Sequence, residues 1–225
     1  MTERLPQPDT AKFPPLEDGD VRCLRPGTLL GRVHAAAGRH PAAWDEFRAF
    51  GPTTSRFDHH PEPSRVHPTR AVMYAAPALR DADGAILPVL RTCLAECFRD
   101  RGVVELARDS PHFALFETTR ELRLLDVADS LWITKAGGNA AISSGARSTA
   151  RAWARAIYRH YKDADAVDGF IYTCSNIPVA RSMVLWERAK DAVPVRPAGH
   201  HPLASAALRA EIEVYAHELN LGLLP

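Results

Sequence analysis

Residues 168–176, DGFIYTCSN, carry side chains whose types and spacing could do chemistry. The apolar, β-favouring run at 170–172 follows an Asp-Gly turn signal and predicts a short strand. Ser175 and Asn176 stand directly after it. A rigid strand that ends on a hydroxyl and an amide holds both groups at the edge of a cleft, where they can hydrogen-bond a ligand. We therefore take the end of this strand as one wall of a candidate site.

Four further side chains could contribute to a site: Arg32 in TLLGRV, Arg56 in SRFD, Tyr74 in VMYAA and Glu96 in LAECF. Each also has an ordinary explanation. An arginine at a strand end usually forms a surface ion pair, and a strand tyrosine usually packs in the core with its hydroxyl bonded. A glutamate on the polar face of a helix is usually solvated. Residue type alone therefore assigns none of them to a site.

The elements that must position these side chains are strands and helices in irregular order. The hydrophobic pattern predicts strands at 28–33, 71–75, 113–116, 122–127, 169–172 and 183–186, and helices at 88–101, 146–161 and 203–219. The helix at 146–161 has the clearest apolar face, and Ser143 and Ser144 before it are expected to cap it. In the helix at 88–101, Glu96 points away from the apolar stripe. Because strict βαβ alternation is absent, we predict an α+β fold.

The domain organisation follows from length and from proline content. Residues 1–20 are Pro-rich and polar, which predicts an irregular N-terminal arm. The remaining residues, 21–225, fit a single domain, and a hydrophobic content of 46% is enough for a sizeable core. Residues 51–69 carry several prolines and histidines and predict a long loop, which is often functional inside a domain.

Charge and cysteine content exclude several classes of protein. With 28 Lys and Arg against 27 Asp and Glu, the net charge is +1, so direct binding to a nucleic-acid backbone is not expected. The four cysteines form no CxxC pair, which is typical of free thiols in a reducing compartment. The N-terminus lacks an apolar signal region, and no apolar run is long enough for a membrane span. We therefore expect a cytoplasmic protein without membrane partners.

The chain contains no GxGxxG, Walker, GxSxG or HExxH motif. Cys93 and Cys97 share a helix face but lack further metal ligands, so we predict no metal site. Four arginines follow each other at helical spacing, and they are expected to form either a solvated face or a surface for a partner or phosphate: Arg147, Arg151, Arg155 and Arg159.

The segments LLGRV, SRFD, VMYAA, CLAECF and DGFIYTCS occur in this order, and VLWERA follows them. This order resembles the RES domain family, which is named for its Arg, Glu and Ser and contains NAD-consuming toxins of bacterial toxin–antitoxin pairs. The resemblance covers residues 29–192. It implies an ADP-ribosyltransferase-like fold, in which a split, mainly antiparallel sheet with flanking helices forms a cleft for NAD.

The resemblance also implies roles for individual residues. Arg32, Tyr74, Glu96 and Ser175 would be catalytic, and three more would bind substrate: Arg56, Phe57 and Asn176. Arginine forks pair with pyrophosphate oxygens, and a carboxylate stabilises the positive charge that develops on the ribose when nicotinamide leaves. NAD would be a substrate rather than a cofactor, and inorganic phosphate the expected co-substrate.

The chain departs from the family pattern at three places. Residues 53–55 are Thr-Thr-Ser where the family has a glycine before the Arg-Phe pair, and Asn176 stands where an arginine is expected. The segment at 80–89 lengthens the stretch between Tyr74 and Glu96, so Glu105 is the alternative carboxylate.

The leading hypothesis is a toxin enzyme that cleaves NAD at the nicotinamide–ribose bond, by phosphorolysis or by hydrolysis. A protein ADP-ribosyltransferase on the same scaffold is the first alternative, and a non-catalytic nucleotide-binding or partner-binding module is the second. The resemblance implies a helix-turn-helix antitoxin as partner and allows a homodimer.

Overall fold

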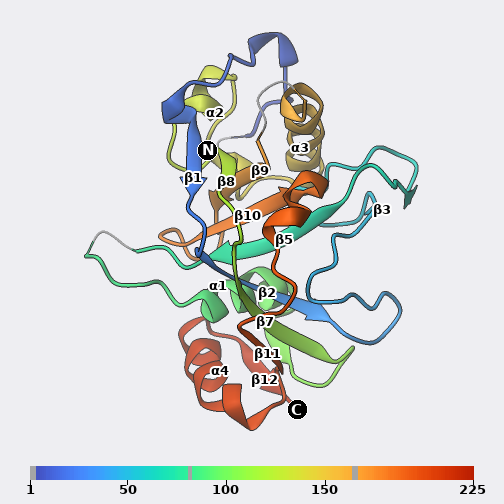
Figure 1. Ribbon diagram of the computed structural model, residues 1–225, viewed down its shortest axis with the longest axis vertical. Coiled ribbons are helices and arrows are strands. Elements are labelled where there is room, and N and C mark those ends of the chain that lie inside the picture. Colours follow the sequence, from blue (N-terminus) through green and yellow to red (C-terminus); the bar gives the residue numbers. More distant parts are fainter. Residues whose placement is uncertain (1–3, 81–82, 164–166) are drawn as a thin grey trace.

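The computed structural model describes residues 4–80, 83–163 and 167–225, and its centre is an eight-stranded sheet in the order β1-β8-β9-β10-β5-β2-β7-β11 (Figure 1). Neighbouring strands run antiparallel except for β8 and β9, which are parallel. The sheet strands are β1 (Val21–Leu24), β2 (Leu29–Ala35), β5 (Val72–Pro77), β7 (Pro111–Glu117), β8 (Leu122–Asp126), β9 (Gly169–Thr173), β10 (Arg181–Trp186) and β11 (Gly199–Pro202).

Two short strand pairs lie outside this sheet. β3 (Phe50–Gly51) pairs with β4 (Arg65–Val66), and β6 (Val103–Glu105) pairs in parallel with β12 (Gly222–Leu224). The helices are α1 (Val89–Phe98), α2 (Trp132–Lys135), α3 (Arg147–Tyr161) and α4 (Ala206–Glu218), and five short 3₁₀ turns are η1 (Thr10–Lys12), η2 (Asp18–Asp20), η3 (Arg99–Arg101), η4 (Ala140–Ile142) and η5 (Glu187–Ala192). The predicted α+β class is confirmed, since a mostly antiparallel sheet is flanked by helices.

The sheet is split where β2 meets β5. These strands pair at two positions, Leu30 with Pro77 and Gly31 with Ala76, and the rest of β2 does not pair with β5. One half of the sheet is therefore β1-β8-β9-β10-β5, and the other is β2-β7-β11. The halves part at the end of β2 that carries Arg32, so the first arginine of the predicted site lies at the opening.

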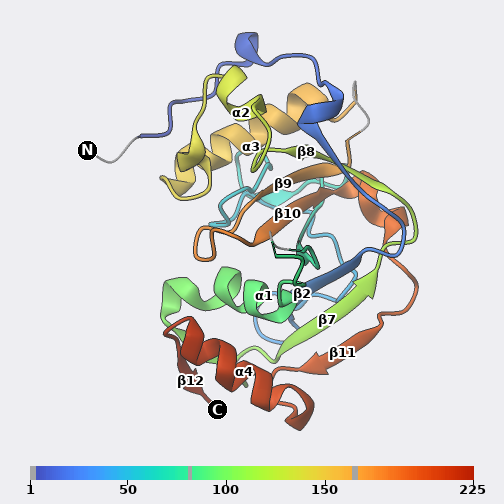
Figure 2. The same ribbon diagram turned by 90° about the vertical axis from the view of Figure 1, so that its left-hand side faces the viewer.

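The first half of the sheet is covered on one face by α2 and α3 (Figure 2). Strand alternation turns Phe170, Tyr172 and Val184 toward these helices, where they share a core with Trp132 and Trp153. The N-terminal arm is irregular apart from two 3₁₀ turns, but it is held against this core. The Trp153 indole donates to the Pro6 carbonyl at 2.8 Å, and the Tyr161 hydroxyl donates to the Pro14 carbonyl at 2.6 Å.

The second half of the sheet carries α1 and α4 (Figure 2). Helix α1 packs onto β2 at Gly31, where a Cβ atom would lie 2.4 Å from Cγ1 of Val89. Glycine is needed at this position because a larger residue would push the helix away from the strand. The close approach brings the exposed face of α1 to the split in the sheet.

The predicted helices and sheet strands exist, with shifted ends. Helix α1 ends at Phe98 and continues as a 3₁₀ turn to Arg101, and α4 begins at Ala206 rather than at residue 203. The expected serine caps are wrong: Ala146 is the N-cap of α3, and it provides no side-chain hydrogen bond. Among the described residues, no helix combines the length and the apolar character that a span of the lipid bilayer requires.

Candidate functional site

A cavity of about 670 Å³ lies at the split in the sheet. Six of the seven predicted site residues line it: Arg32, Arg56, Tyr74, Glu96, Ser175 and Asn176. These residues come from β2, the loop before β4, β5, α1 and the segment after β9, so the fold brings together side chains that are far apart in the sequence. The cavity is large enough for a nucleotide-sized ligand.

Phe57 does not line the cavity. It is fully buried, and its ring packs against Tyr172 at a centroid distance of 4.4 Å and against Phe170 at 5.2 Å. The structure therefore does not place Phe57 where it could touch a ligand. Its packing instead fixes the backbone that carries the neighbouring Arg56 and supports the Tyr172 ring from behind.

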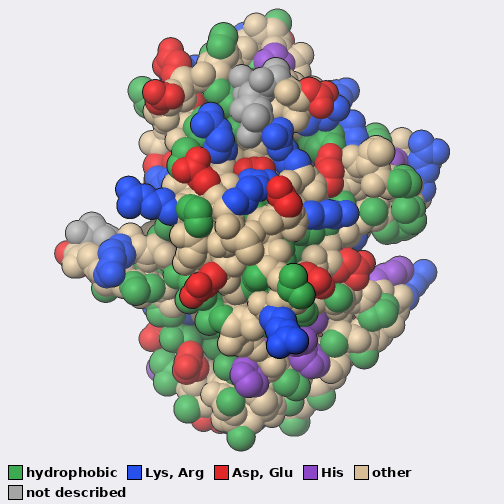
Figure 3. All heavy atoms as spheres, viewed as in Figure 1, with side chains coloured by type: hydrophobic (Ala, Val, Ile, Leu, Met, Phe, Trp, Pro, Cys, Tyr) green, Lys and Arg blue, Asp and Glu red, His purple; other side chains and the backbone are tan. Residues whose placement is uncertain are grey.

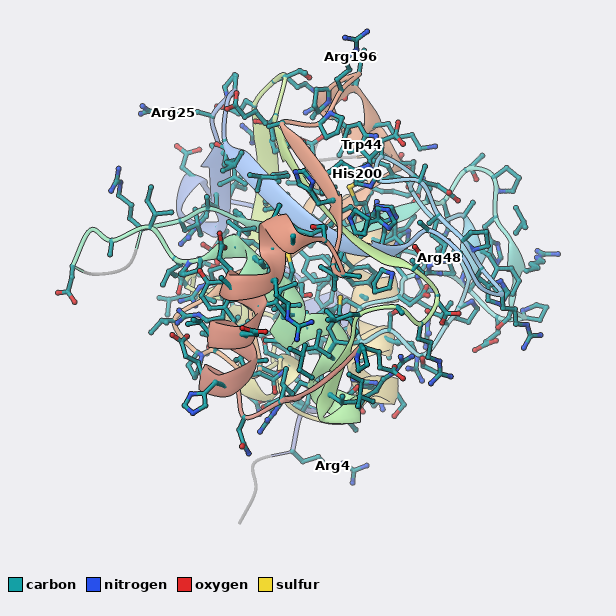
Figure 4. All side chains as sticks on the ribbon, turned by 90° about the horizontal axis from the view of Figure 1, so that it is seen from below. Arg4, Arg25, Trp44, Arg48, Arg196 and His200 are labelled. Carbon is teal, nitrogen blue, oxygen red and sulfur yellow. The ribbon has the colours of Figure 1, made fainter. Side chains whose placement is uncertain are left out.

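Arg32 is held by the loop that follows β2. Its Nη1 donates to the carbonyls of Trp44 and Glu46 at 3.0 and 2.8 Å, while its buried Nε has no hydrogen-bond partner among the described residues. Burial lowers the pKa of Arg32 to about 10, which still leaves it protonated at neutral pH. Arg25 and Arg196, by contrast, project outward from the periphery of the domain (Figure 4). Arg32 therefore offers a positioned positive charge to the cavity.

Arg56 comes from the long loop and reaches the segment before α3. Its Nη1 donates to the Gly145 carbonyl at 2.5 Å. Desolvation and the nearby Arg147 lower the pKa of Arg56, whereas Glu96 raises it. Two cations that line one cavity favour an anionic ligand, and their planar guanidinium groups suit phosphate oxygens.

Glu96 lies on the exposed face of α1, as its helical position predicts, and its open surface faces the cavity that it lines. Its Oε1 accepts a hydrogen bond from Ser182 Oγ at 3.3 Å. Desolvation by the surrounding walls raises the pKa of Glu96, and hydrogen bonds from Cys174, Ser182 and Tyr172, together with the charge of Arg56, lower it. The net direction is upward.

The alternative carboxylate, Glu105, is not a cavity residue. It lies in β6 and forms ion pairs with Arg101 at 2.6 Å and with Arg108 at 3.1 Å. Both arginines lower its pKa. The geometry therefore favours Glu96 over Glu105 as the carboxylate that could meet a ligand.

Tyr74 lies on β5 directly opposite Val184 of β10. Burial raises the pKa of its hydroxyl, so this group stays protonated at neutral pH and can donate a hydrogen bond. Ser175 and Asn176 are exposed at the edge of the cavity, and Asn176 Nδ2 donates to the Ala95 carbonyl at 3.4 Å.

Sequence reasoning missed the residues nearest to the Glu96 carboxylate, which are Tyr172, Cys174 and Ser182. Tyr172 and Ser182 line the cavity, whereas Cys174 is fully buried and is not one of its lining residues. We call Glu96 and these three residues the inner wall. Two signals could have found them. Phe170, Tyr172 and Cys174 stand at alternate positions, along one face of the predicted strand and its continuation, and Ser182 is a polar residue that enters the apolar run of β10. Ser182 pairs directly with Tyr172 across the two strands.

The edge of the cavity is more exposed and carries opposite charges. Asp100, after α1, forms an ion pair with Arg147 at the start of α3, so the pair bridges the helices on two sides of the cavity. We call these two residues, with Ser175 and Asn176, the rim. Arg147 is thus set apart from the rest of its stripe, of which Arg159 is exposed and Arg151 weakly contacts the Thr54 carbonyl at 3.5 Å.

On the face seen in Figure 3, acidic and basic side chains are interspersed, without a large patch of one sign. In the described part of the chain, no group of three His, Cys, Asp or Glu side chains is arranged to hold a metal ion.

Comparison with known proteins gives a likeness in fold alone. No protein-family model matches the chain, and no curated protein matches its sequence. One solved structure is similar: a chain of the Mycobacterium tuberculosis MbcT–MbcA toxin–antitoxin complex, with a TM-score of 0.52 and 13% sequence identity over 91% of this chain and 96% of that chain. The fold class of this protein is therefore that of a chain in a toxin–antitoxin complex.

Proposed function

We propose that this protein is a toxin that degrades NAD by cleaving the bond between nicotinamide and ribose. The observation that carries the proposal is the convergence of Arg32, Arg56, Tyr74 and Glu96 on one cavity at the split in the sheet. The fold likeness to a chain of a toxin–antitoxin complex supports the toxin role. The order of the sequence motifs, which resembles the RES domain family, supports NAD as the substrate.

The charged residues of the cavity suit two parts of NAD, the pyrophosphate and the nicotinamide ribose. Arg32 and Arg56 would bind the pyrophosphate of NAD, because guanidinium groups pair with phosphate oxygens. Glu96 would lie beside the nicotinamide ribose and stabilise the positive charge that develops as the C1''–N bond breaks. Tyr74 would orient the nicotinamide end through its ring and its protonated hydroxyl.

The acceptor in the leading reaction is inorganic phosphate. A phosphate oxygen forms a bond to C1'' while the electron pair of the C1''–N bond leaves with nicotinamide, which becomes a neutral base. The products are nicotinamide and ADP-ribose 1''-phosphate. Water as acceptor would give ADP-ribose, and a protein side chain as acceptor would give an ADP-ribosylated protein.

The direct test is incubation of the purified protein with NAD, with and without inorganic phosphate, followed by mass spectrometry of small molecules and protein. Phosphate-dependent ADP-ribose 1''-phosphate supports phosphorolysis, and phosphate-independent ADP-ribose supports hydrolysis. ADP-ribose attached to protein supports the transferase alternative. Intact NAD in both samples would contradict an NAD-degrading enzyme.

A toxin that consumes NAD requires restraint, so we include an antitoxin partner in the proposal. The simplest block is an acidic or carboxylate-bearing segment of a helix-turn-helix antitoxin in the cavity, near Arg32 and Arg56. If the cavity is shared, saturating ADP-ribose should weaken the binding of a co-expressed partner. Partner affinity that is constant across saturating ADP-ribose would reject this form of inhibition.

A further inference from the structure

The Glu96 carboxylate is met by donors from β10, from β9 and from the residue directly after β9. Ser182 on β10 donates to Oε1 at 3.3 Å. The thiol of Cys174 and the hydroxyl of Tyr172 act on the Glu96 side chain as further donors that lower its pKa. Ser182 and Tyr172 interact with each other as well, which follows from their direct pairing across the strands. The result is a connected network, Tyr172–Ser182–Glu96–Cys174.

All three donors are buried. Tyr172 is 4% exposed, Ser182 is 2% exposed and Cys174 is fully buried. Burial therefore fixes the hydroxyl or thiol group of each residue in place beside the Glu96 carboxylate. Ser175 is exposed at the rim, so Cys174 rather than the neighbouring serine is the residue of this segment that reaches Glu96.

We propose that Ser182 and Cys174 are positioning residues that hold the Glu96 carboxylate toward the nicotinamide ribose. This inference rests on the proposed function for the ribose, although the donor network itself does not. Tyr172 completes the network, since it interacts with both Ser182 and Glu96. A carboxylate held by two or three donors keeps its charge and its direction inside a partly desolvated cavity, which is what stabilisation of a transition state demands.

The ionisation of Glu96 can be followed separately from that of most neighbouring side chains, because most of them do not change charge near neutral pH. Six titratable side chains influence it or are influenced by it: Arg56, Tyr74, Tyr172, Cys93, Cys97 and Cys174. Burial raises the pKa of each of these tyrosines and cysteines, so they are neutral at pH 7, and Arg56 supplies the charge. His34 also lines the cavity, and its pKa is lowered to about 4, so kinetics alone would mix its titration with that of Glu96.

The test is therefore a direct titration of the Glu96 carboxyl carbon by NMR in protein labelled with ¹³C-glutamate. The Glu96 signal is assigned as the one that disappears in Glu96→Gln. Removal of a donor to the charged form raises the pKa of the carboxylate, because it loses stabilisation worth about one pH unit. Ser182→Ala and Cys174→Ala should each raise the pKa of Glu96 by this amount. As the pH is lowered, NAD turnover in both variants should then begin to fall at a correspondingly higher pH than in the wild type.

Two further variants separate positioning from packing. Cys174→Ser keeps a donor and should leave the titration within about a third of a pH unit of the wild type. Thr118→Val removes a buried hydroxyl that donates to the Arg25 carbonyl at 3.1 Å, outside the cavity, and controls for the loss of one buried hydrogen bond. It should lower stability without moving the Glu96 titration.

An unchanged Glu96 titration in both Ser182→Ala and Cys174→Ala would overturn the inference, even if both variants lost stability. If the variants shift the Glu96 titration but the wild type leaves NAD intact, the donor network is supported and the proposed function is rejected. Shifted titrations without any change in the turnover profile would reject the role of these donors in the reaction.

Discussion

The inner wall and the rim of the cavity each present a carboxylate from the same stretch of chain, and the two carboxylates are stabilised in different ways. Glu96 and Asp100 are four residues apart, about one helical turn. Asp100 has 66% of its side chain exposed and is paired with the full charge of Arg147. Glu96 is desolvated by its surroundings and is held mainly by neutral donors, with Arg56 as its charged neighbour.

Because of this difference, the two carboxylates are suited to different tasks. An exposed ion pair contributes at most about 1 kcal/mol and rearranges easily, which suits the entrance of a cavity. A carboxylate held by neutral donors keeps its negative charge uncompensated at close range, so it can interact strongly with a positive charge that develops on a ligand. The contrast leads us to expect large effects on turnover at the inner wall and small ones at the rim.

The largest effect is expected for Glu96→Gln. The change removes the charge but keeps the size of the side chain, so NAD turnover should fall by at least about 100-fold while NAD affinity stays within a few-fold of the wild type. Steady-state kinetics and calorimetric binding measure both quantities. Glu105→Gln is the matched control and should turn over NAD like the wild type, and equal activity in the two variants would remove Glu96 from the mechanism.

The contrast between buried and exposed titratable side chains also applies to the histidines. His59 is fully buried, and desolvation lowers its pKa to about 3. Its unfolded form takes up a proton below pH 6.5 while the folded form does not, so its contribution to stability is complete above pH 6.5 and declines as the pH falls toward 3. Between pH 7 and pH 5 the decline is about 2 kcal/mol.

His59→Phe should therefore flatten the pH dependence of the free energy of unfolding by about 2 kcal/mol over this range. Urea unfolding at the two pH values measures it. His217→Gln, on the exposed face of α4, serves as the control. An identical slope for His59→Phe and wild type would show that the imidazole is already protonated in the folded protein.

Arg32→Lys tests the cationic part of the cavity. Lysine keeps the charge but lacks the guanidinium whose Nη1 donates to the Trp44 and Glu46 carbonyls, and it cannot pair bidentately with phosphate oxygens. We expect KM for NAD to rise about tenfold with a smaller change in kcat. Arg25→Lys, at the periphery, should leave both constants unchanged, and an unaltered KM in Arg32→Lys would exclude Arg32 from binding the pyrophosphate.

The smallest effect is expected at the rim. Asp100→Asn breaks the ion pair with Arg147, and because both side chains are exposed to solvent, KM should change less than about threefold. The difference from wild type should shrink further as salt is raised, since salt screens exposed charges. A loss of turnover as large as that of Glu96→Gln would erase the distinction between rim and inner wall.

The sequence was sufficient for the elements with strong periodicity, and six of the seven residues that it predicted for the site line the cavity. Helix α3 begins one residue after its predicted start and ends at Tyr161 as predicted, because its apolar residues recur at helical spacing. Short strands such as β6 and β11 were missed, since a few residues carry no periodic signal and their pairing is decided by partners far away in the chain.

The inner wall was missed for a related reason. The contacts of Cys174 and Ser182 with Glu96 depend on the register of β9 against β10 and on how closely α1 approaches Gly31. Phe57 was placed among the binding residues because it belongs to the Arg-Phe pair of the family pattern, but it is fully buried in the core, as are residues 58–60. The alternation along β9 and the polar Ser182 are visible in the sequence, but tertiary packing decides which side chain they meet.

The most direct test of the account is a crystal structure of Glu96→Gln with NAD bound, since the variant should bind NAD without consuming it. The account predicts the pyrophosphate against Arg32 and Arg56, with C1'' of the nicotinamide ribose within roughly 4 Å of the side chain at position 96. NAD bound outside this cavity, or bound with its nicotinamide ribose facing away from α1, would contradict it.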